Sequence, residues 1–350
     1  MISVEWLVGP SEGDLSQVAN LFSTFWREVI PAEPDLALAE LVAEIRQAPG
    51  HRRVLVAVAH NRREFTGAAE VVLDDLAGAQ TKAWVKHLVV RPEHRRQGTG
   101  TALLSAIAER ALAEGRSRLE ASVATSHTPG MAFASAAGAT TGLVDRQNRL
   151  RTERLDRALL ESWIARAPER ACDYSLVTFD GLCPEEWLAA FTQVISVMNT
   201  APRAEGTEDV ELTPEQVRNN EEAHLRRGGW GWTVCAAHGP TGELVAYTEL
   251  GGSGHRPWLG IQGDTAVHPA HRNRGLGRWI KAVNGLRLLD DRPEVNVVET
   301  WNAGMNAPML AINDAMGFRR VAEWQEWRLD LVSWRAAHKA SSRSQTANST

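Results

Sequence analysis

The chain has 350 residues, of which 43% are hydrophobic and 23% charged, so it has the composition of a globular protein and the length of two domains. Its formal net charge of −5 argues against general binding to nucleic acid or to membrane surfaces. The three cysteines form no CxxC pair, and no segment has the pattern of a signal peptide or the length of a membrane span. We therefore expect a cytoplasmic protein without a metal site.

In the first half of the chain, hydrophobic periodicity predicts two amphipathic helices, three strands, a long helix, a further strand and a short helix. In that order their ranges are 15–29, 35–47, 53–60, 65–73, 82–90, 100–114, 117–123 and 129–137. A charged, helix-like linker is expected over 151–172.

The second half repeats the same order of elements. Helices are predicted near 184–198 and 213–227, strands at 231–238, 243–250 and 257–267, a helix at 277–289, a strand at 295–300, a helix at 305–316, and strands near 319–324 and 326–332. The helix at 213–227 opens with an N-cap Thr, a Pro and a capping-box Gln. The polar tail at 336–350 is predicted to be disordered.

Two motifs recur in order, which predicts a duplicated domain. HRRQGTGTA at 94–102 is matched by HRNRGLGRW at 271–279, and AAGA at 136–139 by AMGF at 315–318. The spacing between the motifs is nearly the same in both halves. We predict an N-terminal domain over 1–150 and a C-terminal domain over 173–335, joined by the linker.

Each copy has a strand that runs into a Gly-x-Gly turn and then a helix. The free N–H groups and the dipole of a helix N-terminus attract an anion, and glycine lets the backbone approach it closely. Arg95 and Arg96 in the first copy, and Arg272 and Arg274 in the second, add positive charge. We therefore predict a pyrophosphate cradle. A GxxxxGK[ST] P-loop is absent, and so is the third glycine of a GxGxxG dinucleotide motif.

The pattern that fits the turns is R/Q-x-x-G-x-G/A, at 95–100 and 272–277, and it resembles the GNAT superfamily of N-acetyltransferases. Two copies in one chain resemble the tandem architecture of mycothiol synthase. The resemblance implies two α/β (α+β) domains, each with a mixed, mostly antiparallel central sheet flanked by helices. It also implies acetyl-CoA as co-substrate, with its pantetheine arm between a bulged strand and the next strand, which splay apart.

The resemblance also implies which residues contact the cofactor. In the second copy these are Ala266, Val267, Arg272, Asn273, Arg274, Gly275, Leu276, Gly277, Arg278, Asn302 and Asn306. In the first copy they are Val89, Val90, Arg95, Arg96, Gln97, Gly98, Thr99, Gly100 and Thr101. An unpaired N–H at the end of the bulged strand is expected to polarise the thioester carbonyl.

The second copy is expected to be the catalytic one. The family often has Asn, then Tyr seven residues later, then Gly-Phe, and here Asn306 and Asn313 hold the first two places. An Asn amide can donate a hydrogen bond to a leaving thiolate but cannot protonate it. In the first copy the Asn, Tyr and Phe places are taken by His127, Ala134 and Ala139. That copy is expected to be non-catalytic, and the sequence leaves open whether it holds CoA.

Two carboxylates are candidates for the catalytic base. Glu249 ends the strand 243–250, and Asp264 lies in the strand before the second turn. A carboxylate half-buried in the cleft would have its pKa raised toward neutrality, as a base requires. Strand alternation counts against Asp264, because it lies an odd number of residues from Val267.

The expected activity is acetyl-CoA-dependent transfer of an acyl group to the primary amine of a small molecule, by direct attack in a ternary complex. An antibiotic-like amine, an amino sugar and the amine of a thiol metabolite are all open as acceptors. The alternatives are acylation of a protein lysine or N-terminus, and a non-catalytic acyl-CoA sensor. We expect a monomer or homodimer.

Overall fold

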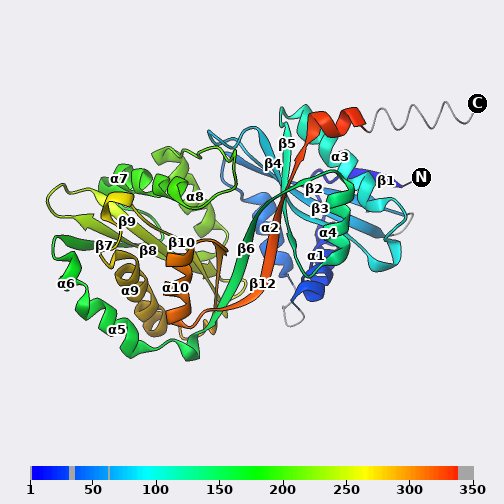
Figure 1. Cartoon of the computed structure of the whole chain (residues 1–350). Helices are drawn as coiled ribbons and strands as arrows, with labels where there is room; N and C mark the ends of the chain where they lie inside the picture. The colour runs from blue at the N-terminus through cyan, green and yellow to red at the C-terminus, as the bar shows by residue number, and fades with distance from the viewer. Residues whose placement is uncertain (1, 31–35, 62–63, 338–350) are drawn as a thin grey trace, which may run out of the picture. The chain divides into compact units, whose positions relative to one another are not determined.

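The computed structural model describes residues 2–30, 36–61 and 64–337, which form two compact units (Figure 1). Unit 1 combines the chain up to Val144 with the chain from Ala322 onward, and unit 2 spans Asp145–Val321. Within the described ranges, no helix combines the length and apolar character that crossing a membrane requires. Most of the tail predicted to be disordered, 338–350, lies outside the described residues, and residues 336 and 337 are helical.

The sheet of unit 1 has the strand order β1-β2-β3-β4-β5-β12, with β4 and β5 parallel and the other neighbouring pairs antiparallel. Its strands are β1 (Ser3–Trp6), β2 (Arg52–His60), β3 (Phe65–Asp74), β4 (Lys82–Val90), β5 (Arg118–Ala124) and β12 (Arg319–Asp330). Its helices are α1 (Glu12–Val29), α2 (Leu38–Arg46), α3 (Thr99–Ala113) and α4 (Thr128–Ala136).

The sheet of unit 2 has the order β6-β11-β10-β9-β8-β7, with β10 and β11 parallel and the other pairs antiparallel. Its strands are β6 (Thr140–Arg151), β7 (Tyr174–Asp180), β8 (Gly229–His238), β9 (Leu244–Ser253), β10 (Leu259–Val267) and β11 (Val297–Ala303). Its helices are α5 (Arg157–Arg166), α6 (Pro168–Ala171), α7 (Glu185–Ile195), α8 (Pro214–Arg226), α9 (Leu276–Asp291) and α10 (Ala307–Met316). Both units therefore have the predicted mixed, mostly antiparallel sheet flanked by helices.

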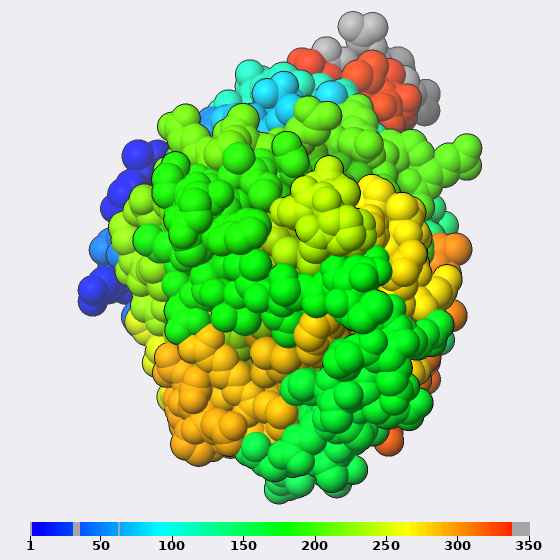
Figure 2. Space-filling view, turned by 90° about the vertical axis from the view of Figure 1, so that its left-hand side faces the viewer, coloured from blue at the N-terminus to red at the C-terminus, as the bar shows by residue number. Residues whose placement is uncertain are grey.

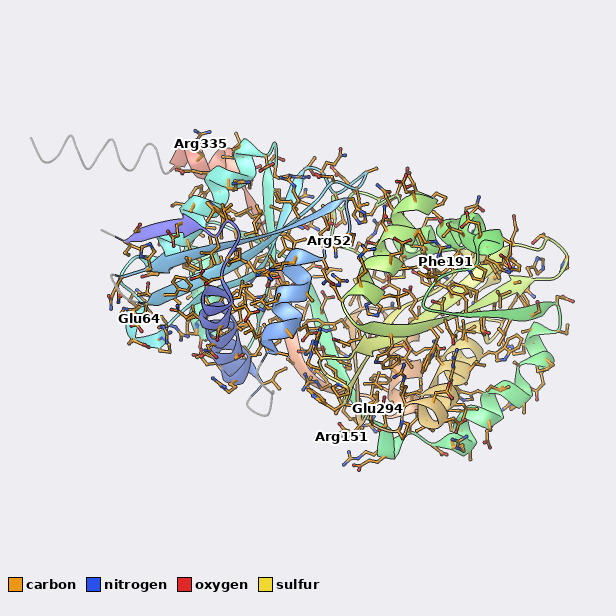
Figure 3. The ribbon with its side chains drawn as sticks, turned by 180° about the vertical axis from the view of Figure 1, so that it is seen from behind. Arg52, Glu64, Arg151, Phe191, Glu294 and Arg335 are labelled. Carbon is orange, nitrogen blue, oxygen red and sulfur yellow. The ribbon has the colours of Figure 1, made fainter. Side chains whose placement is uncertain are left out.

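The units exchange their last strands. Residues 324–330 of β12 pair with β5 in unit 1, and residues 145–151 of β6 pair with β11 in unit 2. Figure 3 labels Arg151, at the end of β6, near Glu294, which precedes β11. Each unit thus takes its last strand from the other half of the sequence, so the compact units differ from the predicted domains 1–150 and 173–335 at their ends.

Most predicted helices and strands are confirmed to within a few residues, and the strand at 82–90 is confirmed as predicted. The prediction needs correction in two respects. It has no element over 3–6, 140–151 or 174–180, where the structure has β1, β6 and β7, and the mostly polar sequence of β6 gives little alternation. The two strands predicted at 319–324 and 326–332 are one strand, β12, followed by a helical segment at 331–337. Trp324 and Trp327 are both buried although they are three residues apart, so β12 lacks a simple period of two.

Helices cover both faces of each sheet. In unit 1, α1 and α2 pack on one face through residues such as Phe22, and α3 packs on the other through Ile107. In unit 2, α7 covers one face with Phe191, which Figure 3 labels, and α9 covers the other with Ile280. Beyond α9, helix α5 packs against it, and Figure 2 looks onto the green surface of α5 and α6.

The strand exchange makes a prediction about stability. Leu329 belongs to the second repeat in sequence, but it is buried in the core of unit 1 with Leu119 and Ile107. We expect Leu329→Ala to lower the free energy of unfolding by about 2–5 kcal/mol through the cavity it leaves. Amide hydrogen exchange should accelerate in β5 and α3. Val321→Ala, at an exposed position of β12, is the control. Faster exchange confined to 145–321 would contradict the exchange of strands.

Candidate active site

The two Gly-x-Gly turns have the same unusual backbone. Gly275 has a φ of 83° and Asn273 a φ of 63°, and α9 begins directly after Gly275. In unit 1 the corresponding values are 89° for Gly98 and 61° for Arg96, followed by α3. These left-handed conformations favour glycine and, less strongly, asparagine. The predicted turn at a helix N-terminus is therefore confirmed in both copies.

A cavity of about 680 Å³ opens at the turn of unit 2, a volume typical of a cofactor site. Its walls come from the turn η3 (Ser196–Thr200), the end of β10, the start of α9, and α10. Of the cofactor contacts predicted in the second copy, all but Arg274 and Asn302 line it. Arg170 also lines it, although it belongs to the predicted linker.

Unneutralised positive charge surrounds this cavity. Arg272 donates to the Val267 carbonyl at 3.1 Å and to Thr200 Oγ1 at 2.8 Å, and Arg170 donates to the Asn273 carbonyl at 2.6 Å. Arg274 and Arg278 lie over aromatic rings. Within the ranges that the structure describes, none of these four arginines has a carboxylate partner. The cavity therefore suits an anion such as a pyrophosphate.

The turn of unit 1 is neutralised by its own chain. Arg95 Nη2 lies 2.8 Å from Glu28 Oε1 and 3.0 Å from Oε2, and His127 Nε2 lies 3.3 Å from Glu28 Oε2. Gln97 and Thr101 stand at the places of Arg274 and Arg278 in the aligned motif. The first-copy residues predicted to bind the cofactor, 89–101, thus have the expected backbone but not the charge of the second copy.

The strand before the turn is bulged and splayed in unit 2. The register of β10 on β9 shifts between Gln262 and Thr265, and β10 pairs with β11 only over 259–261. From Gln262 to Val267 the two parallel strands are no longer paired, which confirms the expected cleft between them. Thr265, Ala266 and Val267 line the cavity from this side.

Glu249 lies on β9 beside the bulge and is partly exposed. Burial raises its pKa to about 8, with further contributions from the negative charges of Asp264 and Glu221. Gly263 in the bulge faces this side chain, because a Cβ built on Gly263 would lie 3.3 Å from Glu249 Cβ and 3.7 Å from Oε2. A partly exposed carboxyl group with a pKa near neutrality is suited to accept a proton.

The odd offset of Asp264 from Val267 places the two residues on opposite faces of β10, and Asp264 shares its face with Ala266 and with Tyr247 and Glu249 of β9. Asp264 lies on the side of Glu249, and the hydroxyl of Tyr247 donates to its Oδ2 over 3.5 Å. Burial and the charges of Asp264 and Glu249 raise the pKa of Tyr247 well above its usual value, so this hydroxyl stays protonated. Partial loss of hydration also raises the pKa of Asp264, although the residue is exposed.

Comparison with known proteins agrees with this geometry. Residues 15–139 match the acetyltransferase (GNAT) family. A tandem GNAT protein from the clavulanic acid biosynthesis pathway has the same fold with a TM-score of 0.77 and 27% sequence identity, over 95% of this chain and 99% of that one. Residues 15–139 belong to the GNAT acetyltransferase family, and the chain as a whole has the fold of that tandem GNAT protein.

Two curated relatives of this GNAT protein are named mycothiol acetyltransferase. The one from Frankia alni is 33% identical over 133 residues, which is 36% of this chain and 37% of the relative. The one from Kineococcus radiotolerans is 28% identical over 131 residues, 37% of this chain and 39% of the relative. The aligned stretch therefore spans little more than a third of the length of these relatives.

This GNAT protein departs from the family pattern at Asn313, where a Tyr is common. Asn313 is buried and donates to Asn302 Oδ1 at 2.8 Å, and neither residue lines the cavity. Asn306 lines it while capping α10, with its Oδ1 accepting from the N–H of Met309 at 3.4 Å. The geometry favours a cofactor contact for Asn306 and a structural role, joining α10 to β11, for Asn313 and Asn302.

Sequence reasoning missed Arg170, Glu221 and Tyr247. Arg170 lies 105 residues before Gly275 in a segment with no motif, and only folding brings it to the turn. Tyr247 stands two residues before Glu249, so the alternation of β9 could have placed both on one face. Among the described residues, no group of three or more His, Cys, Asp or Glu side chains could hold a metal ion.

The raised pKa of Glu249 predicts a pH-dependent stability. Between about pH 4.3, the pKa of an unfolded Glu, and the native pKa of about 8, the native carboxyl holds a proton that the unfolded one has lost. Wild-type stability should therefore fall through this window relative to Glu249→Gln. Thermal unfolding of ligand-free protein should show a gap in Tm between variant and wild type that grows with pH. The exposed Glu243→Gln should show no such trend. A gap that is independent of pH would contradict the shift.

Proposed function

We propose that this protein is an acetyl-CoA-dependent N-acetyltransferase that acts on the primary amine of a small molecule, and that unit 2 carries the reaction. The observation that carries the proposal is the position of Glu249. Its carboxyl lies beside a bulged strand, and the other side of that strand lines the cation-rich cavity. Donor and base would thus meet across one strand.

The donor would bind with its pyrophosphate at the N-terminus of α9. Arg170 and Arg272 would supply positive charge there, and GNAT proteins use acetyl-CoA as co-substrate. The pantetheine arm would run between β10 and β11, where the two strands part after Ile261. The thioester would then reach the bulge next to Thr265.

The reaction would move two protons from the acceptor nitrogen. An amine that arrives as an ammonium first gives one proton to ionised Glu249, and its lone pair then attacks the thioester carbonyl carbon. A backbone N–H of the bulged strand would stabilise the oxyanion that forms. The C–S bond breaks, the leaving thiolate takes a proton, and the second nitrogen proton leaves as the amide forms. The products are the N-acetyl compound, CoA and the proton held by Glu249.

We assign the catalytic role to the C-terminal domain and a non-catalytic role to the N-terminal domain. In unit 1, Glu28 neutralises Arg95, and Ala134 offers no polar group at the Tyr place of the family motif. The match of residues 15–139 to the family indicates fold and ancestry, and it does not identify which of the two domains is catalytic. The names of the relatives, from mycothiol and clavulanic acid metabolism, support a small-molecule acceptor.

The donor site is tested by Gly275→Asp. A Cβ at this position meets no atom within 4 Å, and Asp tolerates the left-handed backbone, so the variant should fold. Its charge would repel the pyrophosphate and weaken acetyl-CoA binding by about tenfold or more in calorimetry.

Gly275→Asn is the matched neutral control and should bind more tightly than Gly275→Asp. Gly98→Asp, the same change in unit 1, should leave turnover unchanged. Full acetyl-CoA affinity in Gly275→Asp would refute the assignment of the donor site.

The base is tested by Glu249→Gln. CoA release, followed with a thiol reagent across a panel of small amines, identifies an acceptor, and its absence with every amine would favour a non-catalytic acyl-CoA-binding protein. With that acceptor, Glu249→Gln should lower kcat by about 10²–10⁴ and abolish the rise of rate with pH toward the Glu249 pKa of about 8.

Asp264→Asn is the informative control, because the charge of Asp264 raises the pKa of Glu249. This variant should stay active, with its pH–rate profile moved to lower pH. A wild-type profile in Glu249→Gln would exclude Glu249 as the base.

A further inference from the structure

The bulged strands of the two units can be compared residue by residue. At the end of β4, Val90 pairs with Gly67 of β3, and at the end of β10, Val267 pairs with Ala246 of β9. Each pair directly precedes its Gly-x-Gly turn, and each strand pair has a register shift shortly before it. Equal distances from these two pairs therefore identify corresponding positions.

Three residues further from the turn along each strand, unit 1 has Glu70 on β3 opposite His87 on β4. At the same distance, unit 2 has Glu249 on β9 and Asp264 on β10. Glu70 is therefore the counterpart of Glu249. It is fully buried, and His87 Nδ1 lies 2.8 Å from its Oε2. Trp26 donates to the other nitrogen of His87 at 3.1 Å, which makes His87 a neutral donor to Glu70.

The next position holds Lys86 in unit 1 and Gly263 in unit 2. Lys86 Nζ lies 3.3 Å from Glu70 Oε1 and also contacts Glu44 of α2. Burial alone would raise the pKa of Glu70, but the hydrogen bond from His87 and the charge of Lys86 lower it. Unit 1 thus contains a primary ammonium, on a slender alkyl chain, bound over the counterpart of the proposed base.

Unit 2 has the carboxylates of this arrangement without its cation. Among the described residues, no lysine or arginine lies within ion-pair distance of Glu249 or Asp264. The nearby Glu221 pairs with Arg218 at 2.9 Å. Gly263 contributes no side chain that could reach Glu249 in the way that Lys86 reaches Glu70. The groups that face Glu249 electrostatically, Asp264 and Glu221, are both carboxylates, so the ligand-free site favours a protonated Glu249, and a bound cation would favour its ionised form.

We propose that the acceptor binds unit 2 as a primary ammonium on an unbranched alkyl chain, with its nitrogen over Gly263 in the place that Lys86 Nζ takes in unit 1. This inference rests on the proposed function and names the chemistry of its acceptor. The complex between ammonium and carboxylate precedes the transfer of the first proton to Glu249.

The surroundings of Gly263 favour an unbranched chain. A single added carbon on Gly263 already approaches Glu249 Cβ to 3.3 Å, so a branched carbon there would clash. Gly231 and Gly251 pair across the strands on the same face as Glu249, and Ile261, 38% exposed, is the next side chain on that face of β10. Methylene groups could lie over the two glycines and against Ile261.

The first experiment measures binding of n-butylamine to the whole protein by chemical-shift titration near neutral pH. We expect saturable binding that weakens by about tenfold or more in Glu249→Gln, as the loss of a buried charge pair requires. Two further probes, tert-butylamine and the neutral 1-butanol, should bind the wild-type protein no more tightly than n-butylamine binds Glu249→Gln. Equal binding to wild type and Glu249→Gln, or equal binding of tert-butylamine, would overturn the proposal.

The second experiment rebuilds the unit 1 arrangement in unit 2. Gly263 does not have a left-handed backbone, so Gly263→Lys should fold, and an acetyl-CoA affinity within about twofold of wild type would verify this. Its ammonium should abolish binding of n-butylamine and lower the pKa of Glu249, read from the carboxyl resonance. Gly263→Met, of similar length without charge, should leave that pKa raised. A wild-type pKa in folded Gly263→Lys would overturn the proposal.

The two proposals fail separately. If amines of the panel are acetylated but n-butylamine binding depends on neither Glu249 nor Gly263, the acceptor chemistry is wrong and the proposed function stands. If n-butylamine binding depends on both Glu249 and Gly263 but no amine leads to CoA release, the ammonium site stands and the proposed function is wrong.

Discussion

The bulge in β10 is the feature on which the site of unit 2 depends. One extra residue between Gln262 and Thr265 parts β10 from β11 and brings Asp264 to the face of Glu249. The buried amide of Gln262 secures this irregular backbone, since its Nε2 donates to the Glu249 carbonyl at 2.6 Å and to Thr248 Oγ1 at 3.0 Å. The cleft beside β11 and the carboxyl group of Glu249 thus lie on the two sides of one strand, where we propose that the thioester and the amine bind.

The two units show how one backbone can support opposite electrostatics. Unit 1 pairs its charges internally, with Glu28 on Arg95 and Lys86 on Glu70. Among the described residues, the arginines at the turn of unit 2 have no carboxylate partner, and Glu249 and Asp264 have no cationic partner. Unpaired charge in partly buried places costs stability, and it persists where a ligand supplies the missing partner. The separation of cations from anions in unit 2 matches a reaction between an anionic donor and a cationic acceptor.

At the family's Tyr place this protein has Asn313, which cannot protonate the leaving thiolate. Its amide is committed to Asn302, and Asn302 also accepts from Asn148 of β6 at 3.4 Å, so these three residues join β11, α10 and β6. In this protein the residue at the family's Tyr place therefore has a structural role beside the cleft. In the proposed reaction the leaving sulfur would then take its proton from water or from the acceptor nitrogen, and it would need no dedicated acid because a thiolate is a good leaving group near neutral pH.

The sequence by itself determined the features that depend on local chemistry. The turns at Gly98 and Gly275 were predictable because the left-handed backbone and close approach need glycine, and the duplication was visible because the motifs recur in order. Only the tertiary structure decided the rest. It set both Gly263 and Asp264 opposite Glu249, because the bulge inserts an extra residue at a position that the local pattern does not predict, and it brought Arg170 to the turn from a segment without a motif. It also decided that β6 and β12 change places, since the free edges of β5 and β11 offer equivalent hydrogen-bonding groups, and a local pattern cannot choose between them.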